Sequence, residues 1–324
     1  MRVLVTGARG KVGAAAVAEL SRAGHQVTAT DLGTPDYGAL APGEAPYLQA
    51  DLTDAGAVHA IVRGMDAVVH AGAIPDPIHH PPHVVFANNV MAGFNVVEAC
   101  VRWQVSRLVN ISSETVPGFI FAEREILPPE LPIDEQTPAA PQDPYAFGKH
   151  VIEQWCDAAI ARSDLTVVSI RPSWVQRDAD DYERNLGPLV RDPTTRSLGF
   201  WSYTDNDDLA VAIRLAVEVE LSGHEVVYIA QPDNATTWQL DDLVAAAFPD
   251  ADINLRNTTA AAPTAGTGRS GIDSSKAQRL LGWSPTRSWR DVLDDDGRRH
   301  GHAAGPEEAG AGRGHSDRAP TTSP

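Results

Sequence analysis

The sequence predicts an α/β fold in which a parallel, Rossmann-like sheet carries helices on both faces and a small C-terminal lobe completes the chain. Short apolar runs alternate with amphipathic stretches of helical length up to Pro172. A glycine-rich segment directly follows the first apolar run, and polar or small residues stand where several of the runs end. Strands that alternate with helices in this way form right-handed crossovers, so neighbouring strands become parallel.

The expected elements follow from the period of the apolar residues, which is short in strands and close to 3.6 in helices. The expected strands are residues 2–6, 26–31, 47–51, 67–71, 107–112 and 165–171. The expected helices between them are residues 13–22, 55–64, 84–103 and 145–161.

After Pro172 the pattern loosens, and residues 173–204 are expected to be mixed and loop-like. Further elements are predicted as helices at 207–219, 240–248 and 274–281, a strand at 226–230 and a loop or linker at 258–271. We expect a main sheet domain of residues 1–172 joined by 205–231, and a lobe of residues 173–204 and 232–296. The end of the chain, 297–324, lacks Leu, Ile, Val, Met and aromatic residues, so it is expected to be disordered.

Composition narrows the class of partner. The chain has 324 residues, 43% of them hydrophobic, and a formal net charge of −17. Such an acidic surface repels nucleic acid and anionic lipid, so we expect neither as a partner. Only Cys100 and Cys156 are present, which predicts no disulfide framework. We find no apolar run of about 18 residues, and the first strand leaves no room for a leader, so we expect a cytoplasmic protein.

The segment Thr6-Gly7-Ala8-Arg9-Gly10-Lys11-Val12-Gly13 lies between the first strand and the first helix. Gly7 permits a tight turn, Gly10 lets the backbone approach a pyrophosphate, and Gly13 allows the helix to pack closely on the sheet. The N-terminus of a helix offers free N–H groups and a favourable dipole to phosphate. This segment therefore predicts a dinucleotide site.

An acidic residue at the end of the second strand indicates which dinucleotide is bound. Asp31 follows the glycines by about 20 residues, where a carboxylate accepts hydrogen bonds from the adenosine ribose. A carboxylate there repels a 2′-phosphate, which favours NAD over NADP. Arg9 and Lys11 are nearby cations and keep NADP open as the alternative.

Two further strand ends point toward the same edge of the sheet. Asp51 and Leu52 end the third strand and are predicted to contact the adenine. His70, Ala71 and Gly72 end the fourth, where small residues let the backbone approach the cofactor. Ligands of open α/β sheets bind at this carboxyl edge.

The candidate catalytic residues are Ser113, Tyr145 and Lys149. Tyr145 and Lys149 are four residues apart on a predicted helix and share a face. We expect the ammonium to lower the pKa of the phenol, so that Tyr145 acts as a general acid or base. Ser113 ends the fifth strand, where its hydroxyl can hold the reacting oxygen.

With these motifs in place, the chain resembles the extended short-chain dehydrogenase/reductases, the NAD-dependent epimerase/dehydratase family. The matching segments are residues 6–13, Asp31, 51–52, 70–73, 88–90, 112–113, 132–135, 145–149, 171–172, 207–210 and 276–285. The resemblance implies that the main sheet domain binds NAD, that Tyr145 is the acid/base, that Lys149 contacts the nicotinamide ribose and that Ser113 polarises the substrate oxygen. It also implies dimers that pack helices 84–103 and 145–161 into a four-helix bundle.

The resemblance assigns the site residue by residue. The cofactor-binding positions would be Gly7, Arg9, Gly10, Lys11, Val12, Gly13, Asp31, Asp51, Leu52, His70, Ala71, Gly72, Asn88, Tyr145 and Lys149. The substrate-binding positions would be Ile74, Ser113, Glu114, Arg171, Ser173, Trp174 and Trp201. Arg171 could pair with a substrate carboxylate, or be satisfied by backbone carbonyls or Asp208. Trp174, Trp201 and Tyr203 could line a sugar pocket or belong to the core.

Departures from the family pattern restrict the substrate. Pro117 stands where an aromatic residue is common, and Gly148 where a Ser is common. Glu114 is followed by Thr115 instead of completing an Asp-Glu pair, which disfavours dehydration. The stretch between Arg171 and Asp207 is short, which favours a substrate smaller than a nucleotide sugar, and residues 197–209 resemble uronate dehydrogenases.

Three histidines after the fourth strand raise the question of a metal. His79, His80 and His83 are interrupted by Pro81 and Pro82, and no Cys or acid completes a tetrahedral set. We therefore expect no metal and interpret this loop as a lid over the substrate.

The predicted function is NAD-dependent oxidoreduction or epimerisation at a secondary alcohol or ketone of a sugar-like substrate, in which Tyr145 accepts the hydroxyl proton. A dehydrogenase would release the ketone, whereas an epimerase would return hydride to the other face. The sequence leaves both open, together with a uronate-type dehydrogenase. A non-catalytic NAD(P)-sensing regulator is the alternative from another class, although the intact Ser113, Tyr145 and Lys149 argue against it.

Overall fold

The computed structural model describes residues 1–34, 45–257, 263 and 265–301. Its main sheet has seven parallel strands in the order β10-β7-β5-β4-β1-β2-β3. The strands are β1 (Arg2–Thr6), β2 (Gln26–Asp31), β3 (Tyr47–Gln49), β4 (Ala67–His70), β5 (Arg107–Ile111), β7 (Thr166–Pro172) and β10 (His224–Ile229). The strand order reverses between β1 and β4, which is where open α/β sheets bind ligands. The predicted fold class is therefore confirmed.

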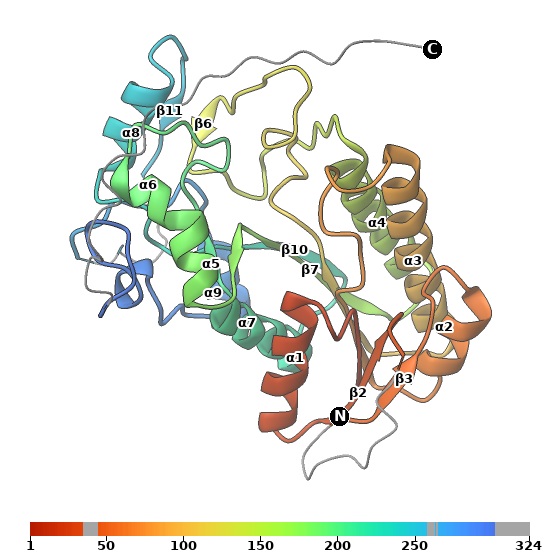
Figure 1. The fold of residues 1–324 in the computed structure, drawn as a ribbon. Helices are drawn as coiled ribbons and strands as arrows, with labels where there is room; N and C mark the ends of the chain where they lie inside the picture. The colour runs from red at the N-terminus through yellow and green to blue at the C-terminus, as the bar shows by residue number, and fades with distance from the viewer. Residues whose placement is uncertain (35–44, 258–262, 264, 302–324) are drawn as a thin grey trace, which may run out of the picture.

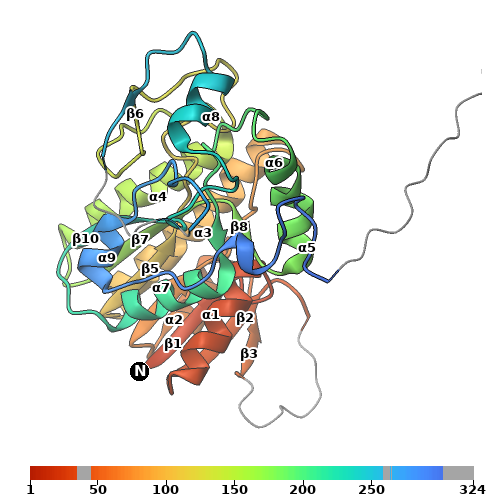
Figure 2. The same cartoon turned by 90° about the vertical axis from the view of Figure 1, so that its left-hand side faces the viewer.

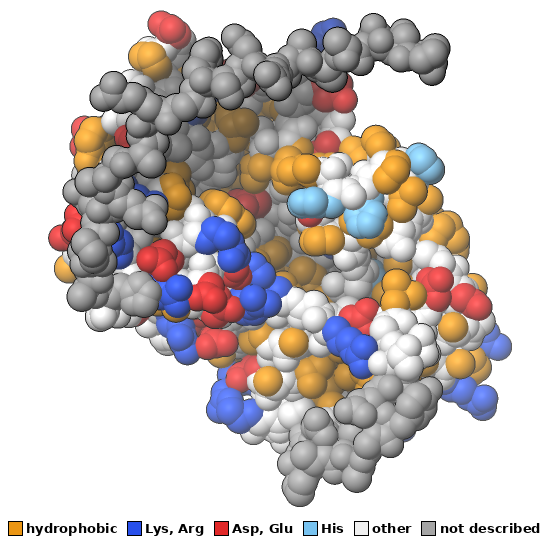
Figure 3. Space-filling view, viewed as in Figure 1, with side chains coloured by type: hydrophobic (Ala, Val, Ile, Leu, Met, Phe, Trp, Pro, Cys, Tyr) orange, Lys and Arg blue, Asp and Glu red, His pale blue; other side chains and the backbone are white. Residues whose placement is uncertain are grey.

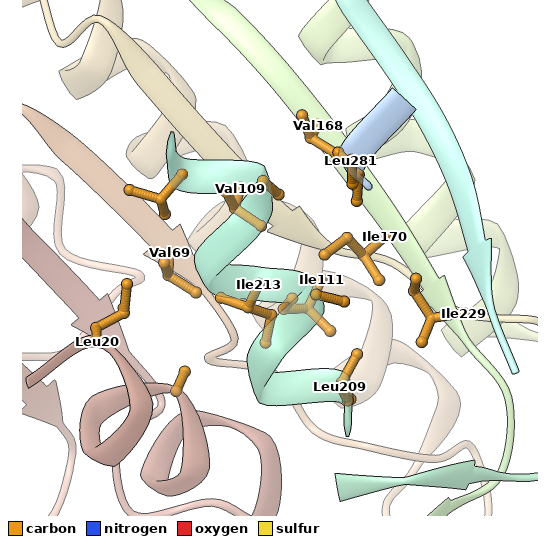
Figure 4. Close-up of a cluster of buried hydrophobic side chains, with 14 of the residues drawn as sticks. Leu20, Val69, Val109, Ile111, Val168, Ile170, Leu209, Ile213, Ile229 and Leu281 are labelled. Atoms are coloured by element: carbon orange, nitrogen blue, oxygen red, sulfur yellow. The ribbon is translucent and has the colours of Figure 1, made fainter. Parts of the chain in front are cut away.

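Helices cover both faces of this sheet (Figure 1). One face carries α1 (Lys11–Arg22), α7 (Asn206–Glu218) and α9 (Ser275–Leu281), and the other carries α2 (Ala55–Val62), α3 (Pro82–Arg102) and α4 (Pro144–Ile160). Figure 4 shows Leu209 and Ile213 of α7 packed against Val69, Val109 and Ile111 of the sheet. These strands read as nearly continuous apolar runs because helices bury them on both sides.

Helix α3 is the one described helix that is long and apolar enough to cross a membrane by length and composition. Its best window has a mean hydropathy of 1.5, and half of that window is buried inside the protein. Its apolar residues form no continuous run, because Asn89, Asn95 and Glu98 interrupt them. Val96 and Val97 are buried with residues of α2 and α4, as in the core helix of a sheet protein.

The lobe lies beyond the carboxyl ends of the strands (Figure 2). Its elements are β6 (Glu130–Leu131), β8 (Val175–Gln176), α5 (Ala179–Asp181), the π-helical turn η1 (Tyr182–Leu186), α6 (Gly187–Arg191), β9 (Thr204–Asp205), α8 (Leu240–Ala247), β11 (Asn254–Leu255) and the 3₁₀ turn η2 (Trp289–Asp291). A separate cluster of buried aromatic and aliphatic residues, including Tyr182, Phe200, Trp201 and Trp289, forms its core.

The expectation that residues 173–204 are loop-like was wrong for the continuous helical stretch 179–191. Asp178 caps this stretch by accepting a hydrogen bond from the N–H of Asp181. Tyr182, Leu186, Leu189 and Val190 are buried at the spacing of one helical face. The capping Asp178 and the helical spacing of the apolar residues are both present in the sequence. The charged residues among the apolar ones obscured this helical pattern.

The predicted disorder from residue 297 onward was wrong for residues 297–301, whereas residues 302–324 lie outside the described chain. Arg299 forms ion pairs with Asp180 and Glu183 at 2.6 Å each. The N–H of His300 donates to the carbonyl of Val292. Polar contacts with α5 and η1 therefore order a segment that has no apolar side chains to bury. Part of the predicted 258–271 loop, at 258–262 and 264, also lies outside the described residues.

A Ser-His-Asp chain links β7, β10 and α4 within the sheet domain. Ser169 Oγ lies 2.8 Å from His224 Nε2, and His224 Nδ1 lies 2.7 Å from Asp157 Oδ1. Ser169 is fully buried, and its hydroxyl also accepts a hydrogen bond from Asn110 Nδ2 at 3.1 Å. A nucleophile must meet its substrate, so this chain joins structural elements and does not form a hydrolase site.

Replacing Ser169 with Ala should destabilise the protein by roughly 1–3 kcal/mol, because Asn110 and His224 would lose a buried partner. Chemical denaturation measures this loss. Asp157→Asn is the matched control and should cost less than about 1 kcal/mol, because the Asp157 side chain is 55% exposed. Labelling of Ser169 by a fluorophosphonate probe would contradict the structural role.

Candidate active site

The turn between β1 and α1 forms a cradle that only glycine can build. Gly7 has φ +65°, and a Cβ at Gly7 would lie 2.6 Å from the carbonyl oxygen of Ala71. A Cβ at Gly13 would lie 2.1 Å from the carbonyl oxygen of Gly7. No side chain in the described ranges caps α1, which leaves the N–H groups of its first turn available to a ligand. This geometry fits the pyrophosphate of a dinucleotide.

Thr6 and His70 form a hydrogen-bonded pair next to this cradle. Thr6 Oγ1 accepts hydrogen bonds from the N–H groups of Ala71 and Gly72, both at 3.2 Å, and lies 2.9 Å from His70 Nδ1. Because the Thr6 oxygen accepts twice, its own proton is available for His70. Burial, followed by the charge of Lys149, lowers the pKa of His70 to about 3, so its imidazole is neutral. The pair joins β1 to β4 without adding charge.

Asp31 lies at the end of β2, where it was predicted to meet the adenosine ribose. Its Oδ2 accepts a hydrogen bond from the N–H of Arg9 at 2.9 Å, and its Oδ1 accepts one from Leu32 at 2.8 Å. The guanidinium of Arg9 packs over the ring of Tyr47, 4.5 Å from its centroid, and donates to the carbonyl of Thr34. The carboxylate thus stays beside the glycine turn, as a ribose site requires.

Lys11 has a role that the sequence did not indicate. Its Nζ lies 2.8 Å from Asp181 Oδ2 and donates to the carbonyl of Val175 at 2.9 Å. Asn206 Nδ2 also donates to the carbonyl of Lys11. The ammonium therefore ties the glycine turn to the lobe, and a contact between its side chain and the cofactor stays a prediction.

The remaining predicted cofactor residues are positioned by local contacts. Asp51 is exposed and accepts hydrogen bonds from the N–H and hydroxyl of Thr53. Leu52 is buried where a Cβ on Gly72 would meet it. Asn88 Nδ2 donates to Asn89, and Asn89 in turn holds both the N–H and the carbonyl of Ile74. Val12 packs against the sheet core beneath the turn.

The structure brings Ser113, Tyr145 and Lys149 together at the end of β5. Asp143 caps α4 and accepts hydrogen bonds from Tyr145 and Ala146, both at 2.9 Å, which fixes Tyr145 in the first turn. The oxygen of Ser113 accepts from both the N–H and the hydroxyl of Thr115. Its own proton is therefore free to be donated, and hydrogen bonding from Ser113 lowers the pKa of the Tyr145 phenol.

The prediction that Lys149 lowers the pKa of Tyr145 was wrong for this chain by itself. Burial raises the pKa of the Tyr145 phenol to about 12, and the hydrogen bond from Ser113 offsets only part of that rise. Lys149 Nζ donates to the carbonyl of Ile111 at 2.6 Å and lies over the tyrosine ring, 5.7 Å from its centroid. Burial lowers the pKa of Lys149 to about 8.

Arg171 does not face the substrate region. Its Nε and Nη2 contact the two oxygens of Glu153 at 2.9 and 2.7 Å, and its Nη1 donates to the hydroxyl of Tyr228 at 3.2 Å. These partners differ from the predicted substrate carboxylate and from the alternative partners, backbone carbonyls and Asp208. Glu153 went unnoticed because it looks like one more polar residue on a long helix.

The predicted aromatic wall is only partly open. Trp201 is 1% exposed, lies in the core of the lobe and donates from its indole to the carbonyl of Thr195, so the prediction that it lines a pocket was wrong. Tyr203 is also fully buried. Trp174, by contrast, is 46% exposed and directly follows Ser173, whose hydroxyl bonds Glu114.

The histidine loop lies beside the site. Asp76 Oδ1 is 2.9 Å from His79 Nδ1, and the charge of Asp76 acts on the pKa of Tyr145. Histidine side chains are visible near the central hollow in Figure 3. Across the described ranges, no group of three or more His, Cys, Asp or Glu could hold a metal ion. The lid role of this loop stays a prediction.

Arg171→Met should lower the free energy of unfolding by about 3–5 kcal/mol, because Glu153 would remain buried without its cation. The double variant Glu153→Met, Arg171→Met should recover most of that loss. Thermal and denaturant unfolding test both variants. If Arg171→Met kept full stability and lost only binding of an acidic substrate, the substrate-binding role would stand instead.

Comparisons with known proteins agree with this geometry. A model of the NAD dependent epimerase/dehydratase family matches residues 3–176. A uronate dehydrogenase of Pseudomonas syringae pv. tomato is 29% identical over 73% of this chain and 76% of its own length. A UDP-glucose 4-epimerase of Lactobacillus helveticus is 34% identical over 49% of this chain and 48% of its own. The structure of MoeE5 in complex with UDP-glucose and NAD has a TM-score of 0.64 at 23% identity, covering 90% of this chain and 95% of that one. The resemblance drawn from the motifs is confirmed, and the chain belongs to the NAD-dependent epimerase/dehydratase family of enzymes.

Proposed function

We propose that this enzyme transfers hydride between NAD and a secondary alcohol or ketone of a sugar-like substrate, with Tyr145 as the acid/base. One observation carries the proposal: Ser113, after the carboxyl end of β5, and Tyr145, in the first turn of α4, are close enough that hydrogen bonding from Ser113 acts on the pKa of the phenol. A substrate oxygen that contacts both would have a donor on one side and a proton acceptor on the other.

The residues fit the cofactor at both ends. The N–H groups of the turn from Gly7 to Gly13 would hold the pyrophosphate, and Asp31 would accept hydrogen bonds from the ribose. When bound, NAD supplies the hydride acceptor. Ser113 would then stabilise the charge that develops on the substrate oxygen, and Tyr145, as the phenolate, would receive the hydroxyl proton. Lys149, whose pKa burial lowers to about 8, can exchange protons near neutral pH.

Two finer assignments share this machinery. A dehydrogenase would release the ketone, and an epimerase would return hydride to the opposite face. The uronate dehydrogenase relative supports the first, whereas the epimerase relative supports the second over a shorter part of the chain. A regulator that senses NAD(P) without chemistry is disfavoured, because it would not need the contact between Ser113 and Tyr145.

We also propose that two copies pair through α3 and α4. Val84 and Met91 of α3 and Phe147 of α4 are 37–47% exposed, and Phe147 stacks on Phe86 at 5.7 Å. The two helices lie side by side at the surface (Figure 1). A second copy would remove this apolar strip from water. The free, buried thiols of Cys100 and Cys156 are consistent with the proposed cytoplasmic location.

Tyr145→Phe should reduce turnover by about 10²–10⁴-fold, because the phenyl ring keeps the packing but cannot accept the proton. Incubation with NAD and a panel of sugars would be followed by absorbance of NADH and by chromatography for an epimer. NADH released in proportion to the sugar identifies a dehydrogenase, and interconversion of sugars with tightly held NADH identifies an epimerase. Full activity in the Phe variant would refute the acid/base role.

Val84→Lys with Met91→Lys should convert the proposed dimer into a monomer, because a second copy would bury the added charges. Sedimentation velocity measures the mass. Ile78→Lys, at a loop residue that is 70% exposed, is the control and should leave the mass unchanged. A wild-type protein that sediments as a monomer would rule out this interface.

A further inference from the structure

The carboxyl group of Glu114 lies at the meeting point of two strand ends and one loop of the lobe. Glu114 directly follows Ser113, and its N–H donates to the carbonyl of Pro172 at the end of β7. Its Oε2 accepts a hydrogen bond from Ser173 Oγ at 2.6 Å. A Cβ on Gly199 would lie 3.9 Å from the same oxygen. The carboxyl therefore borders the space beside the proposed catalytic residues.

Glu114 is half-buried, and its two carboxyl oxygens are not used equally. Oε1 of Glu114 has no hydrogen-bond partner among the described residues, yet it is not one of the polar atoms sealed from solvent without a partner. The charge of Glu114 also acts on the pKa of Tyr145, so the two groups are close. Oε1 is thus available to a bound molecule.

Among the described residues, no cation compensates the carboxyl group of Glu114. In the described part of the chain, no Lys, Arg or His forms an ion pair with Glu114, and its pKa responds only to burial and to Ser173. Arg171 is engaged by Glu153, and Lys149 by the carbonyl of Ile111. Arg196, from the neighbouring lobe segment, pairs with Glu125.

Burial raises the pKa of Glu114 to about 8, so the group is mostly a neutral acid at neutral pH. Since Oε2 accepts from Ser173, the proton belongs on Oε1, where it can be donated to a ligand. The titratable groups that surround this region are Tyr145 and Lys149 of α4, Asp143 at its cap, and Asp76 after β4. Of these four groups, only Lys149 is a base that can carry a positive charge, and it is engaged by the carbonyl of Ile111.

The loop that covers Glu114 is held in a strained conformation. Phe200 and Trp201 have φ of +50° and +54°, a region that bulky residues rarely adopt. Both side chains are buried, and a Cβ on Gly271 would lie 2.4 Å from the Cβ of Phe200, so packing fixes the strained backbone. Strain maintained in this way is typical of binding sites. Gly199 is therefore a rigid wall beside the carboxyl.

The geometry points to Glu114 and Ser173 as the pair that determines substrate specificity, by binding a hydroxyl group of a neutral sugar and disfavouring a sugar that carries a carboxylate. This inference rests on the proposed function, whose site it extends. A hydroxyl can accept the proton of Oε1 and donate in return. A substrate carboxylate would find no free cation among the described residues, so its burial would remain uncompensated.

Matched pairs of ligands test this inference, because each pair differs only at one carbon. D-glucose is compared with D-glucuronate, and UDP-glucose with UDP-glucuronic acid. Binding is measured by calorimetry with the NAD-loaded Tyr145→Phe protein, in which turnover does not interfere. We expect at least one neutral ligand to bind more than about 10-fold more tightly than its acidic counterpart, a difference of about 1.4 kcal/mol.

Variants of Glu114 and Ser173 distinguish an effect on ligand preference from an effect on folding. Glu114→Gln keeps the shape and removes the titrating proton, so the preference for the neutral ligand should shrink by about 10-fold or more. In the parent protein, neutral-ligand affinity should decline as the pH rises through about 8, and this decline should disappear in the Gln variant. Ser173→Ala should weaken the neutral ligand, and thermal unfolding should confirm that both variants fold.

Each remaining outcome decides the question. Equal or tighter binding of the acidic ligand overturns the inference, as does a preference that Glu114→Gln leaves unchanged, or the absence of binding by either member of both pairs. Loss of the proposed function would be recognised separately, by a Tyr145→Phe enzyme that still turns over its substrate, because the binding comparison does not depend on hydride transfer.

Discussion

The buried contact between Glu153 and Arg171 determines how the candidate active site is arranged. Glu153 belongs to α4, and it accepts hydrogen bonds from Arg171 of β7 and from Ser112 at the end of β5. Arg171 extends the connection to Tyr228 of β10. Glu153, Arg171 and Ser112 are each no more than 6% exposed. The helix that carries Tyr145 and Lys149 is thereby fixed to the strand that presents Ser113, and catalysis by proton transfer requires that alignment.

The same contact sets the charge of the substrate region. An arginine at this position could otherwise reach a substrate, but here it is engaged by Glu153, and the half-buried carboxyl of Glu114 remains next to Ser113. Lys11 is similarly engaged on the cofactor side, because its ammonium forms an ion pair with Asp181 at the junction with the lobe. In both places a cation that looks available in the sequence is used to assemble the fold. What remains at the open edge of the sheet is rich in hydroxyls and acids.

The sequence predicted those features that depend on spacing along the chain. The glycines of the first turn, the pair formed by Tyr145 and Lys149, and the strand-end position of Ser113 follow from local geometry, and the structure brings them together as the spacing indicates. The helical stretch 179–191 was missed because its apolar face is interleaved with charged residues. Features that depend on contacts between distant segments were not predictable: the partner of Arg171 is 18 positions away on another element, and the residues that bury Trp201 come from the whole lobe.

The pKa of Tyr145 shows that the spacing of a motif does not by itself determine the protonation state of its residues. The motif places an ammonium four residues from a phenol, which suggests an acidified tyrosine. In the folded chain the ammonium lies over the ring and donates to the carbonyl of Ile111, so burial prevails and the phenol stays protonated. In the proposed mechanism, the positive charge that ionises the phenol would come from the oxidised nicotinamide of bound NAD. In the proposed mechanism, a tyrosine that becomes a base only in the assembled complex would not act on solvent or on stray alcohols beforehand. The burial that raises its pKa would thus favour selectivity, and we propose the same role for the half-buried carboxyl of Glu114 on the substrate side.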